Sequence, residues 1–310
     1  MRVTTSMFPD ALVAQLNMLQ QRQQQLQTEA ATGLRVQLPS DDPSATRLVL
    51  DMQGESQQVS QYKANISTLL QQATASSSAM QQLKTIADRA GEIATQADGT
   101  SSQQDLTNYA TEVTQLIQQA AQIMNTQFQG DYLFGGTQTS QPPYVVATDS
   151  NGTITGVTYE GNTTTAQVEI AQGDTVSVQT IGANTTGGGP QGLITDTRSG
   201  ADLFNHLISL QNNLRAGNTA AITSTDQANL SKDDQNIITQ IASNAAIQDR
   251  LNTASSIADT RTAALTQLIS NQADADMAQT ITQLSQTQNA YSAALQSGAA
   301  IMQLSILNYL

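Results

Sequence analysis

Apolar residues recur at heptad spacing toward both ends of the chain, and this periodicity limits the possible folds more than any other feature. Near the N-terminus the repeat is interrupted by Gln23, and the segment closes at Gly33, shortly before Pro39. The apolar positions of this repeat are Leu12, Leu16, Leu19, Leu26 and Ala30. Because residues three and four apart share one face of an α-helix, the pattern predicts a helix with a narrow apolar stripe.

A second helix is predicted to begin at the helix-cap motif Asp41-Asp42-Pro43. The Asp42 carboxylate can accept the free N–H groups of the first turn, and Pro43 suits the first helical position. A seam of about 50 residues follows, which corresponds to about 75 Å of helix and is typical of a rod. Its members are Leu48, Met52, Val59, Tyr62, Ile66, Leu69, Ala73, Met80, Leu83, Ala87, Ala90 and Ala94.

Helical periodicity resumes after a break near residues 98–100, and again after residue 200. The third seam contains Leu106, Tyr109, Val113, Leu116, Ala120 and Ile123. The later seams contain Leu203, Leu207, Leu210 and Leu214, then Ile237, Ile241, Leu251, Ala258, Leu265 and Ile269, and finally Met277, Ile281, Leu284, Tyr291, Leu295 and Met302. Long helices on both sides of an insertion must pair with each other to bury such seams.

Between the helical parts the sequence changes character at Gly130. Gly, Pro and Asn turn signals separate short β-prone runs at residues 144–146, 153–159, 165–170 and 175–180. This spacing predicts a small antiparallel β domain. The predicted fold is therefore mainly α, an elongated antiparallel helical coiled-coil rod with an inserted β domain. We expect three parts: a terminal helical pair (1–42 and 270–310), a central helical bundle (43–130 and 198–269) and the β domain (131–197).

Composition excludes several classes of function. The net charge is -13 and the 12 Lys and Arg residues are scattered, whereas nucleic acids and anionic membranes attract clustered basic residues. No apolar run is long enough to span a bilayer, so we expect neither a nucleic-acid partner nor membrane insertion. The first ten residues lack the apolar core of a signal peptide, and the absence of cysteine indicates that no disulfide framework was built.

No group of residues predicts catalysis or metal binding. Asp41 and Asp42 could form a metal pair, but they point in different directions and have no third ligand nearby, so helix capping is favoured. His206 is the single histidine, which favours a surface or packing role over a catalytic triad. The glycine-rich pieces lack the Lys-Ser or Lys-Thr of a phosphate-binding loop. We therefore expect no enzyme activity, no metal and no cofactor.

Three stretches carry a family resemblance. They are residues 32–36 with 39–43 and Ala45, residues 130–139 with 142–144, and the C-terminal stretch 269–310. With them the chain resembles the hook-associated protein type 3 family of bacterial flagella, the hook–filament junction proteins of the flagellin superfamily. Flagellins are the closest alternative, but they typically have Ala-Lys-Asp-Asp-Ala where this chain has Pro-Ser-Asp-Asp-Pro, and they usually end in arginine.

The resemblance implies an extracellular location at the hook–filament junction, reached through the flagellar type III export apparatus without a signal peptide. It implies four kinds of partner: copies of the same chain, the adjoining type 1 hook-associated junction protein, flagellin, and a cytosolic export chaperone. A filament-forming flagellin and a coiled-coil surface adhesin with the β domain as its binding head remain as alternatives.

The apolar stripes of the two chain ends are the candidate functional site. Each end is short and narrowly apolar, and isolated helices of this kind are marginal in water. We expect both ends to be disordered in the monomer and to order only against other copies. The candidate assembly residues are Leu12, Leu16, Leu19, Leu26, Ile281, Leu284, Leu295, Ile301, Leu304 and Leu307.

Overall fold

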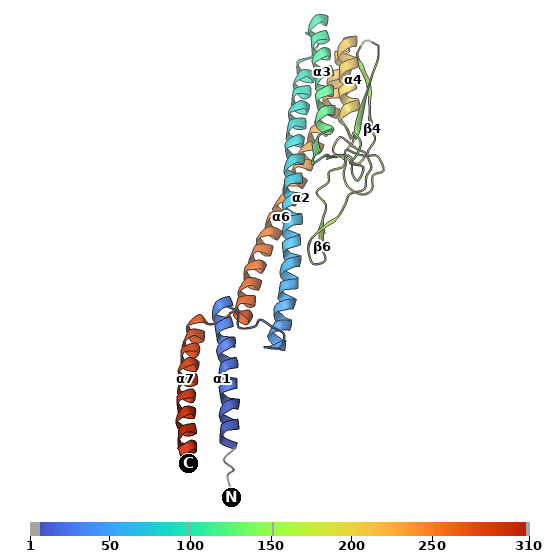
Figure 1. The fold of residues 1–310 in the computed structure, drawn as a ribbon. Helices are drawn as coiled ribbons and strands as arrows, with labels where there is room; N and C mark the ends of the chain where they lie inside the picture. Colours follow the sequence, from blue (N-terminus) through green and yellow to red (C-terminus); the bar gives the residue numbers. More distant parts are fainter. Residues whose placement is uncertain (1–6, 98, 151, 308–310) are drawn as a thin grey trace. The chain divides into compact units, whose positions relative to one another are not determined.

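The computed structural model describes residues 7–97, 99–150 and 152–307, with side chains described between residues 10 and 300. The long helices are α1 (Met7–Thr32), α2 (Pro43–Gln96), α3 (Gln103–Met124), α4 (Leu203–Ala216), α6 (Gln227–Ala273) and α7 (Met277–Leu307) (Figure 1). The mainly helical fold with a small, largely antiparallel β insertion is confirmed.

The chain divides into two compact units. The large unit comprises residues 59–259, and the terminal unit combines the residues up to 58 with those from 260 onward. Helices α2 and α6 contribute residues to both units, because each helix crosses a unit boundary. The three-part division expected from the sequence remains a prediction.

The main hydrophobic core of the large unit joins the second half of α2 to α3, α4 and the beginning of α6. Helix α2 supplies small side chains there, and Ala87, Ala90 and Ala94 are buried. Methyl groups let neighbouring backbones approach closely, and longer side chains fill the remaining space. Leu207 and Leu214 of α4 are fully buried in this core, as the heptad spacing predicts.

Helices α4 and α6 are joined by a tight connection that the sequence pattern does not indicate. Gly217 ends α4 in the left-handed conformation, with φ of 66°, which favours glycine. The short helix α5 (Thr219–Ala221) and a π-helical turn, η1 (Ile222–Asp226), then lead into α6. The buried Asp226 carboxylate accepts hydrogen bonds from Ser209 Oγ at 2.8 Å and Asn213 Nδ2 at 2.7 Å.

The inserted region consists of short strands. They are β1 (Gln127–Phe128), β2 (Asp131–Tyr132), β3 (Tyr144–Thr148), β4 (Ile154–Tyr159), β5 (Val168–Ala171), β6 (Asp174–Val176), β7 (Ala183–Asn184), β8 (Thr195–Asp196) and β9 (Ala201–Asp202). Consecutive strands form the antiparallel hairpins β1–β2, β3–β4 and β5–β6, while β8 pairs in parallel with β7 and antiparallel with β9. The β3–β4 hairpin packs against α3 and α4.

The β5–β6 hairpin builds a second hydrophobic core against the middle of α2 and α6. Ile170 and Val176 of the hairpin are buried there with Leu69 and Leu251 of the helices. Asn65 Nδ2 donates a hydrogen bond to the Glu169 carbonyl at 2.9 Å. The insertion is therefore packed onto the long helices of its unit rather than attached by its ends alone.

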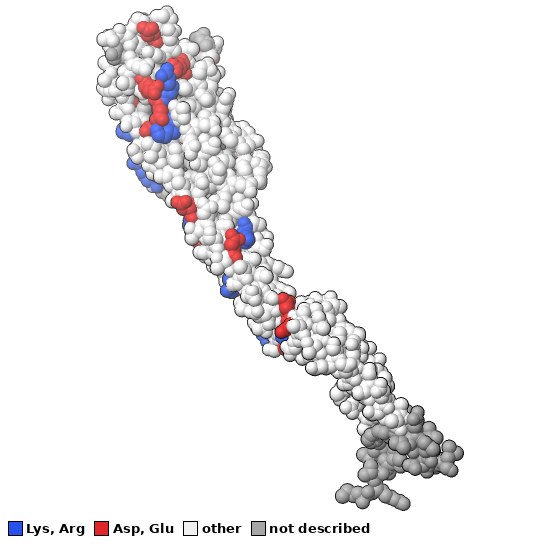
Figure 2. Space-filling model, turned by 90° about the vertical axis from the view of Figure 1, so that its left-hand side faces the viewer, with Lys and Arg blue, Asp and Glu red and all other residues white. Residues whose placement is uncertain are grey.

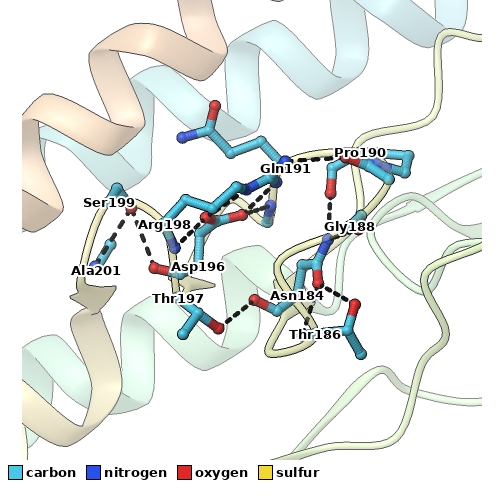
Figure 3. A network of polar contacts seen from close by, with 12 residues as sticks. Asn184, Thr186, Gly188, Pro190, Gln191, Asp196, Thr197, Arg198, Ser199 and Ala201 are labelled. Carbon is cyan, nitrogen blue, oxygen red and sulfur yellow. Dashed lines mark hydrogen bonds and ion pairs between the residues drawn. The ribbon is translucent and has the colours of Figure 1, made fainter.

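A network of buried polar side chains fixes the loop between β7 and β9 (Figure 3). The Asp196 carboxylate, whose side chain is fully buried, accepts the Gly192 and Arg198 backbone N–H groups, both at 2.9 Å. The Arg198 guanidinium donates to the same carboxylate from Nε at 3.0 Å and Nη2 at 2.7 Å. Asn184 Nδ2 donates to the Gly188 and Pro190 carbonyls, both at 2.6 Å.

Helix α6 presents buried polar residues to this loop region. The Asp233 carboxylate accepts the Asp202 N–H at 2.8 Å and lies 2.8 Å from His206 Nδ1. Asn236 Nδ2 donates to the Gly192 carbonyl at 2.9 Å and to the Leu193 carbonyl at 2.8 Å. His206, the single histidine, therefore supports packing between α4 and α6.

One position of the predicted α2 seam is wrong. Leu48 is 46% exposed, whereas Met52 one turn later is buried. Ala45, three residues before Leu48, is buried as well, so the helical period does not account for the exposure of Leu48.

Candidate assembly interface

The candidate site lies in the terminal unit, where α1 and α7 pack along each other (Figure 1). The helices run antiparallel, so the start of α1 lies beside the end of α7. Near that end, Gly298 closely faces Leu12: a Cβ atom at Gly298 would lie 2.5 Å from Leu12 Cδ2. Arg22 Nη2 donates to Gln283 Oε1 at 3.0 Å farther along the pair. Two segments separated by more than 250 residues are thus held side by side.

Backbone hydrogen bonds tie together the segments that lead into and out of this pair. The Arg35 N–H donates to the Ala273 carbonyl at 2.7 Å, and the Ala275 N–H donates to the Gly33 carbonyl at 2.8 Å. Gly33 has φ of 73°, a conformation that glycine adopts without strain, and it ends α1 as the sequence predicts. The loop after α1 and the turn before α7 therefore form one linked structure.

The predicted cap residues have separate roles in that linked structure. Asp42 Oδ1 accepts the Ala45 N–H at 3.0 Å at the start of α2, which is the bond expected of a cap. Hydrogen bonding to the Ala45 N–H, together with the nearby Arg35 guanidinium, lowers the pKa of the Asp42 carboxyl despite partial burial. Asp41 instead accepts the Gln37 and Leu38 N–H groups, at 3.2 Å and 2.9 Å, and closes the loop before the helix.

The candidate assembly residues differ in how far the terminal unit itself covers them. Leu26 is fully buried. Four are half-buried: Leu12, Leu16, Leu19 and Leu284. Ile281 is 53% exposed and Leu295 is 46% exposed, so the pair leaves part of its apolar stripe open to solvent. The side chains of Ile301, Leu304 and Leu307 lie outside the described residues, although their backbones continue α7.

Further apolar residues of the terminal unit are exposed and were not in the predicted set. Val13 and Met18 of α1 are 55% and 68% exposed, and Met277 at the start of α7 is also exposed. Val13 and Met18 lie beside the heptad stripe, which is why the seven-residue pattern misses them, whereas Met277 belongs to the predicted seam of α7 but was not among the assembly residues. A search for apolar residues on every face of the terminal helices would have found them. They widen the uncovered apolar area of the helix pair.

The terminal helices carry very little charge. Helix α7 contains no Asp, Glu, Lys or Arg over its 31 residues, and α1 contains only Asp10, Arg22 and Glu29. In Figure 2 the described atoms of this pair are almost entirely white. The exposed surface is therefore made of Gln, Thr, Ser and Ala with interspersed apolar side chains. Such a surface can be buried without the large desolvation penalty of ionised groups.

The described part of the chain offers no arrangement suited to metal chemistry, because no three His, Cys, Asp or Glu residues there could hold one ion. No helix among the described residues is long and apolar enough to cross a membrane. The terminal unit leaves part of its apolar helix surface exposed to solvent.

Comparison with known proteins relates the first part of the chain to one family. The family model for the bacterial flagellin N-terminal helical region matches residues 3–139, which include α1, α2 and α3. The match relates the first part of the chain, just under half of its length, to the flagellin family. The flagellar hook-associated protein 3 of Salmonella typhimurium is 29% identical to this chain over 150 residues. That match covers 48% of this chain and spans about half of the relative, 47% of its length.

Solved structures agree with this fold. A Vibrio parahaemolyticus protein described as a flagellar hook-associated protein superposes with a TM-score of 0.65 at 19% identity, covering 76% of this chain and all of the other. FlgL of Bacillus cereus gives 0.53 at 17% identity, covering 72% and 99%. The hook-associated protein 3 of Legionella pneumophila gives 0.51 at 14%, covering 76% and 98%. These likenesses show that the chain shares the fold of the FlgL and hook-associated protein 3 structures.

Proposed function

We propose that this chain is a structural subunit of the bacterial flagellum that joins the hook to the filament and assembles through its two terminal helices. The names of its relatives, flagellar hook-associated protein 3 and FlgL, support this role. The observation that carries the proposal is the α1–α7 pair, which has few charges and leaves Ile281, Leu295 and Met18 exposed. The role is structural rather than catalytic.

Assembly would work by completing the cover of these helices. Isolated helices gain little stability from propensity alone, and most of their stability comes from burying an apolar face. In a free subunit, the loss of conformational entropy opposes the ordering of α1 and α7, and part of their apolar face remains exposed to water. Neighbouring subunits supply the missing buried surface, so ordering and docking are coupled. Growth at the tip of an existing structure is then favoured over association in free solution.

The proposed partners follow from this location. Copies of the same chain would pack laterally against the terminal helices. The type 1 hook-associated junction protein would lie on one side of these subunits, and flagellin would lie on the other side. The chain would reach the outside of the cell through the flagellar type III export apparatus, held beforehand by a cytosolic chaperone. The two chain ends carry few charges and bury little apolar surface by themselves. These properties are compatible with passage of the unfolded chain through the export apparatus.

A second candidate is the filament subunit, favoured by the match of residues 3–139 to the flagellin N-terminal region. Deleting the gene distinguishes the two functions. A junction protein predicts cells that keep their hooks, lack filaments and release flagellin into the medium as monomer. Complementation with the intact gene should restore the filaments. Intact filaments in the deletion strain would reject the junction role, and purified chain that polymerises alone into long filaments would favour the filament subunit.

Assembly through these helices should depend little on salt. Because α7 has no side chain that is charged at neutral pH, ion pairs contribute little, and screening has little to act on. Raising NaCl from about 50 mM to about 500 mM should change the extent of incorporation less than about twofold. The measurement is sedimentation of assembled against free chain. A loss of tenfold or more would mean that charged residues elsewhere in the chain carry the contact.

A further inference from the structure

A hollow of about 440 Å³ lies within the large unit, between one face of α6 and the β5–β6 hairpin with the segment that follows it. Gln240, Ser243, Asn244 and Ile247 of α6 form one wall, because residues three, four and seven apart share a helix face. The opposite wall comes from residues 175–181. The volume falls within the usual range of small-molecule sites.

One buried polar group in this hollow has no partner. Asn244 is 2% exposed, lines the hollow, and its Nδ2 atom has no hydrogen-bond acceptor within the protein. Its Oδ1 atom already accepts a hydrogen bond from Gln248 Nε2 at 2.6 Å. A buried amide left with free N–H donors is unfavourable unless something accepts them. Because Asn244 also lines the hollow, a molecule bound there would be one source of the missing acceptor.

The rim of the hollow is held rigidly by the polar network of Figure 3. Pro190 and Gln191 line the hollow, and the Pro190 carbonyl is fixed by Asn184 Nδ2 at 2.6 Å. Gln191 donates from Nε2 to Asn236 Oδ1 at 2.7 Å, and its carbonyl accepts Gln240 Nε2 at 3.2 Å. A lining fixed before binding loses little entropy when a ligand enters.

The chemistry of the lining selects an uncharged ligand. Amides and hydroxyls dominate it, and the charged residue at its edge, Arg250, is already paired with Asp174 and with the Thr175 carbonyl. An ionised ligand would find no free counter-charge among these lining residues. Side chains that both donate and accept match hydroxyl groups, which do the same. Val176 and Ile247 add apolar surface for the C–H face of a ring.

An extended peptide strand fits this site less well than a compact ligand. Strand addition needs free backbone groups at a sheet edge. Beside the hollow, the Ala166 N–H already donates to Gln179 Oε1 at 2.6 Å, so this group is not free to pair with an added strand. We propose that the hollow between α6 and the β5–β6 hairpin is a binding site for a neutral saccharide, with Asn244 donating to a sugar oxygen. This site goes beyond the junction role and does not depend on it.

The test is a titration of the soluble full-length chain with glucose, galactose and N-acetylglucosamine, followed by two-dimensional ¹H–¹⁵N NMR of the side-chain amides. At least one sugar should shift the Asn244 side-chain resonances saturably, with a dissociation constant on the order of millimolar, because the ligand is small. Asn244→Leu, which removes the donor at similar volume, should weaken binding at least about fivefold. Asn252→Leu, at an exposed position of the same helix, is the matched control and should bind normally.

Thr180→Val removes a hydroxyl group from the lining of the hollow at nearly the same side-chain volume. This variant tests the site if Asn244→Leu fails to fold. It should also weaken binding. Three results would overturn the proposal: no saturable shift with any of the sugars, shifts that are the same in both lining variants as in the native chain, or binding only of a Thr/Gln-rich heptapeptide added as a control ligand. Persistent bound water at Asn244 with no sugar response would likewise overturn it, because the hollow would then hold solvent only.

Discussion

Replacing Leu295 with aspartate is expected to abolish incorporation into the flagellum while the soluble chain keeps its fold. Leu295 is 46% exposed in the terminal unit, so a carboxylate there remains solvated in the free subunit. In the assembled state a neighbouring helix would cover it. An unpaired carboxylate loses several kcal/mol when it is buried, which corresponds to at least about a 100-fold loss of association. Leu19→Asp should act in the same direction, although Leu19 is half-buried already.

The measurement compares incorporation by the variants in a strain that lacks the native gene, with circular dichroism of each purified chain. Leu295→Met keeps an apolar side chain of similar volume and should restore incorporation. Gln115→Asp adds the same charge at an exposed position of α3 and should assemble normally. Normal assembly of Leu295→Asp would show that this stripe is not the contact between subunits.

Replacing Asp196 with asparagine is expected to give the largest loss of stability in the large unit. The fully buried carboxylate accepts two backbone N–H groups and two guanidinium N–H groups. Asparagine has one acceptor oxygen, and its NH₂ group would face donors. Because hydrogen bonds to a charged group contribute more than neutral ones, we expect a loss of about 2–3 kcal/mol at pH 7. Asp88→Asn, in an exposed pair with Lys84, should change stability by less than about 0.5 kcal/mol.

The same variant tests the pH dependence of the loop network. Burial opposes ionisation of Asp196, but hydrogen bonds from Arg198 and Gly192 outweigh it and hold the pKa below the ordinary value of 3.8. A lowered folded-state pKa stabilises the chain above the unfolded-state pKa, and this contribution is lost as the pH falls through the folded-state value. Urea denaturation should be measured from pH 7 to pH 3 for the native chain and for Asp196→Asn. The difference between their free energies of unfolding should decrease only below about pH 4. A difference that stays constant down to pH 3 would contradict the claim that Asp196 is ionised in the folded chain.

Much of the fold follows from local signals in the sequence. Gly33 ends α1 and Pro43 begins α2 because these residues suit left-handed and first-turn conformations. The heptad spacing gives the buried leucines of α4 in full. In α3 it gives most of the buried face, but Tyr109 and Leu116 are only partly buried. The hairpins β3–β4 and β5–β6 fall on runs of β-prone residues separated by turns.

The rest depends on contacts that no periodic pattern records. Asp233, Asn236 and Gln240 of α6 have the composition of a solvated face, yet they are buried because loop carbonyl and N–H groups lie opposite them. The π-helical turn at residues 222–226 ends at the buried Asp226, whose hydrogen-bond donors Ser209 and Asn213 come from α4. In the terminal unit, the heptad stripe includes Leu26, which is buried, but does not include Met18, which is exposed. Exposed apolar residues need not follow the period of a buried seam.

The central claim is that the terminal helices stay incompletely covered until other subunits pack on them. Amide hydrogen exchange measured peptide by peptide, on the soluble chain and on isolated hook–filament junctions, tests this most directly. We predict that α1 and α7 exchange rapidly in the soluble chain while α3 and α4 stay protected, and that α1 and α7 become protected after assembly. Protection of α1 and α7 equal to that of α3 in the soluble chain would contradict the claim.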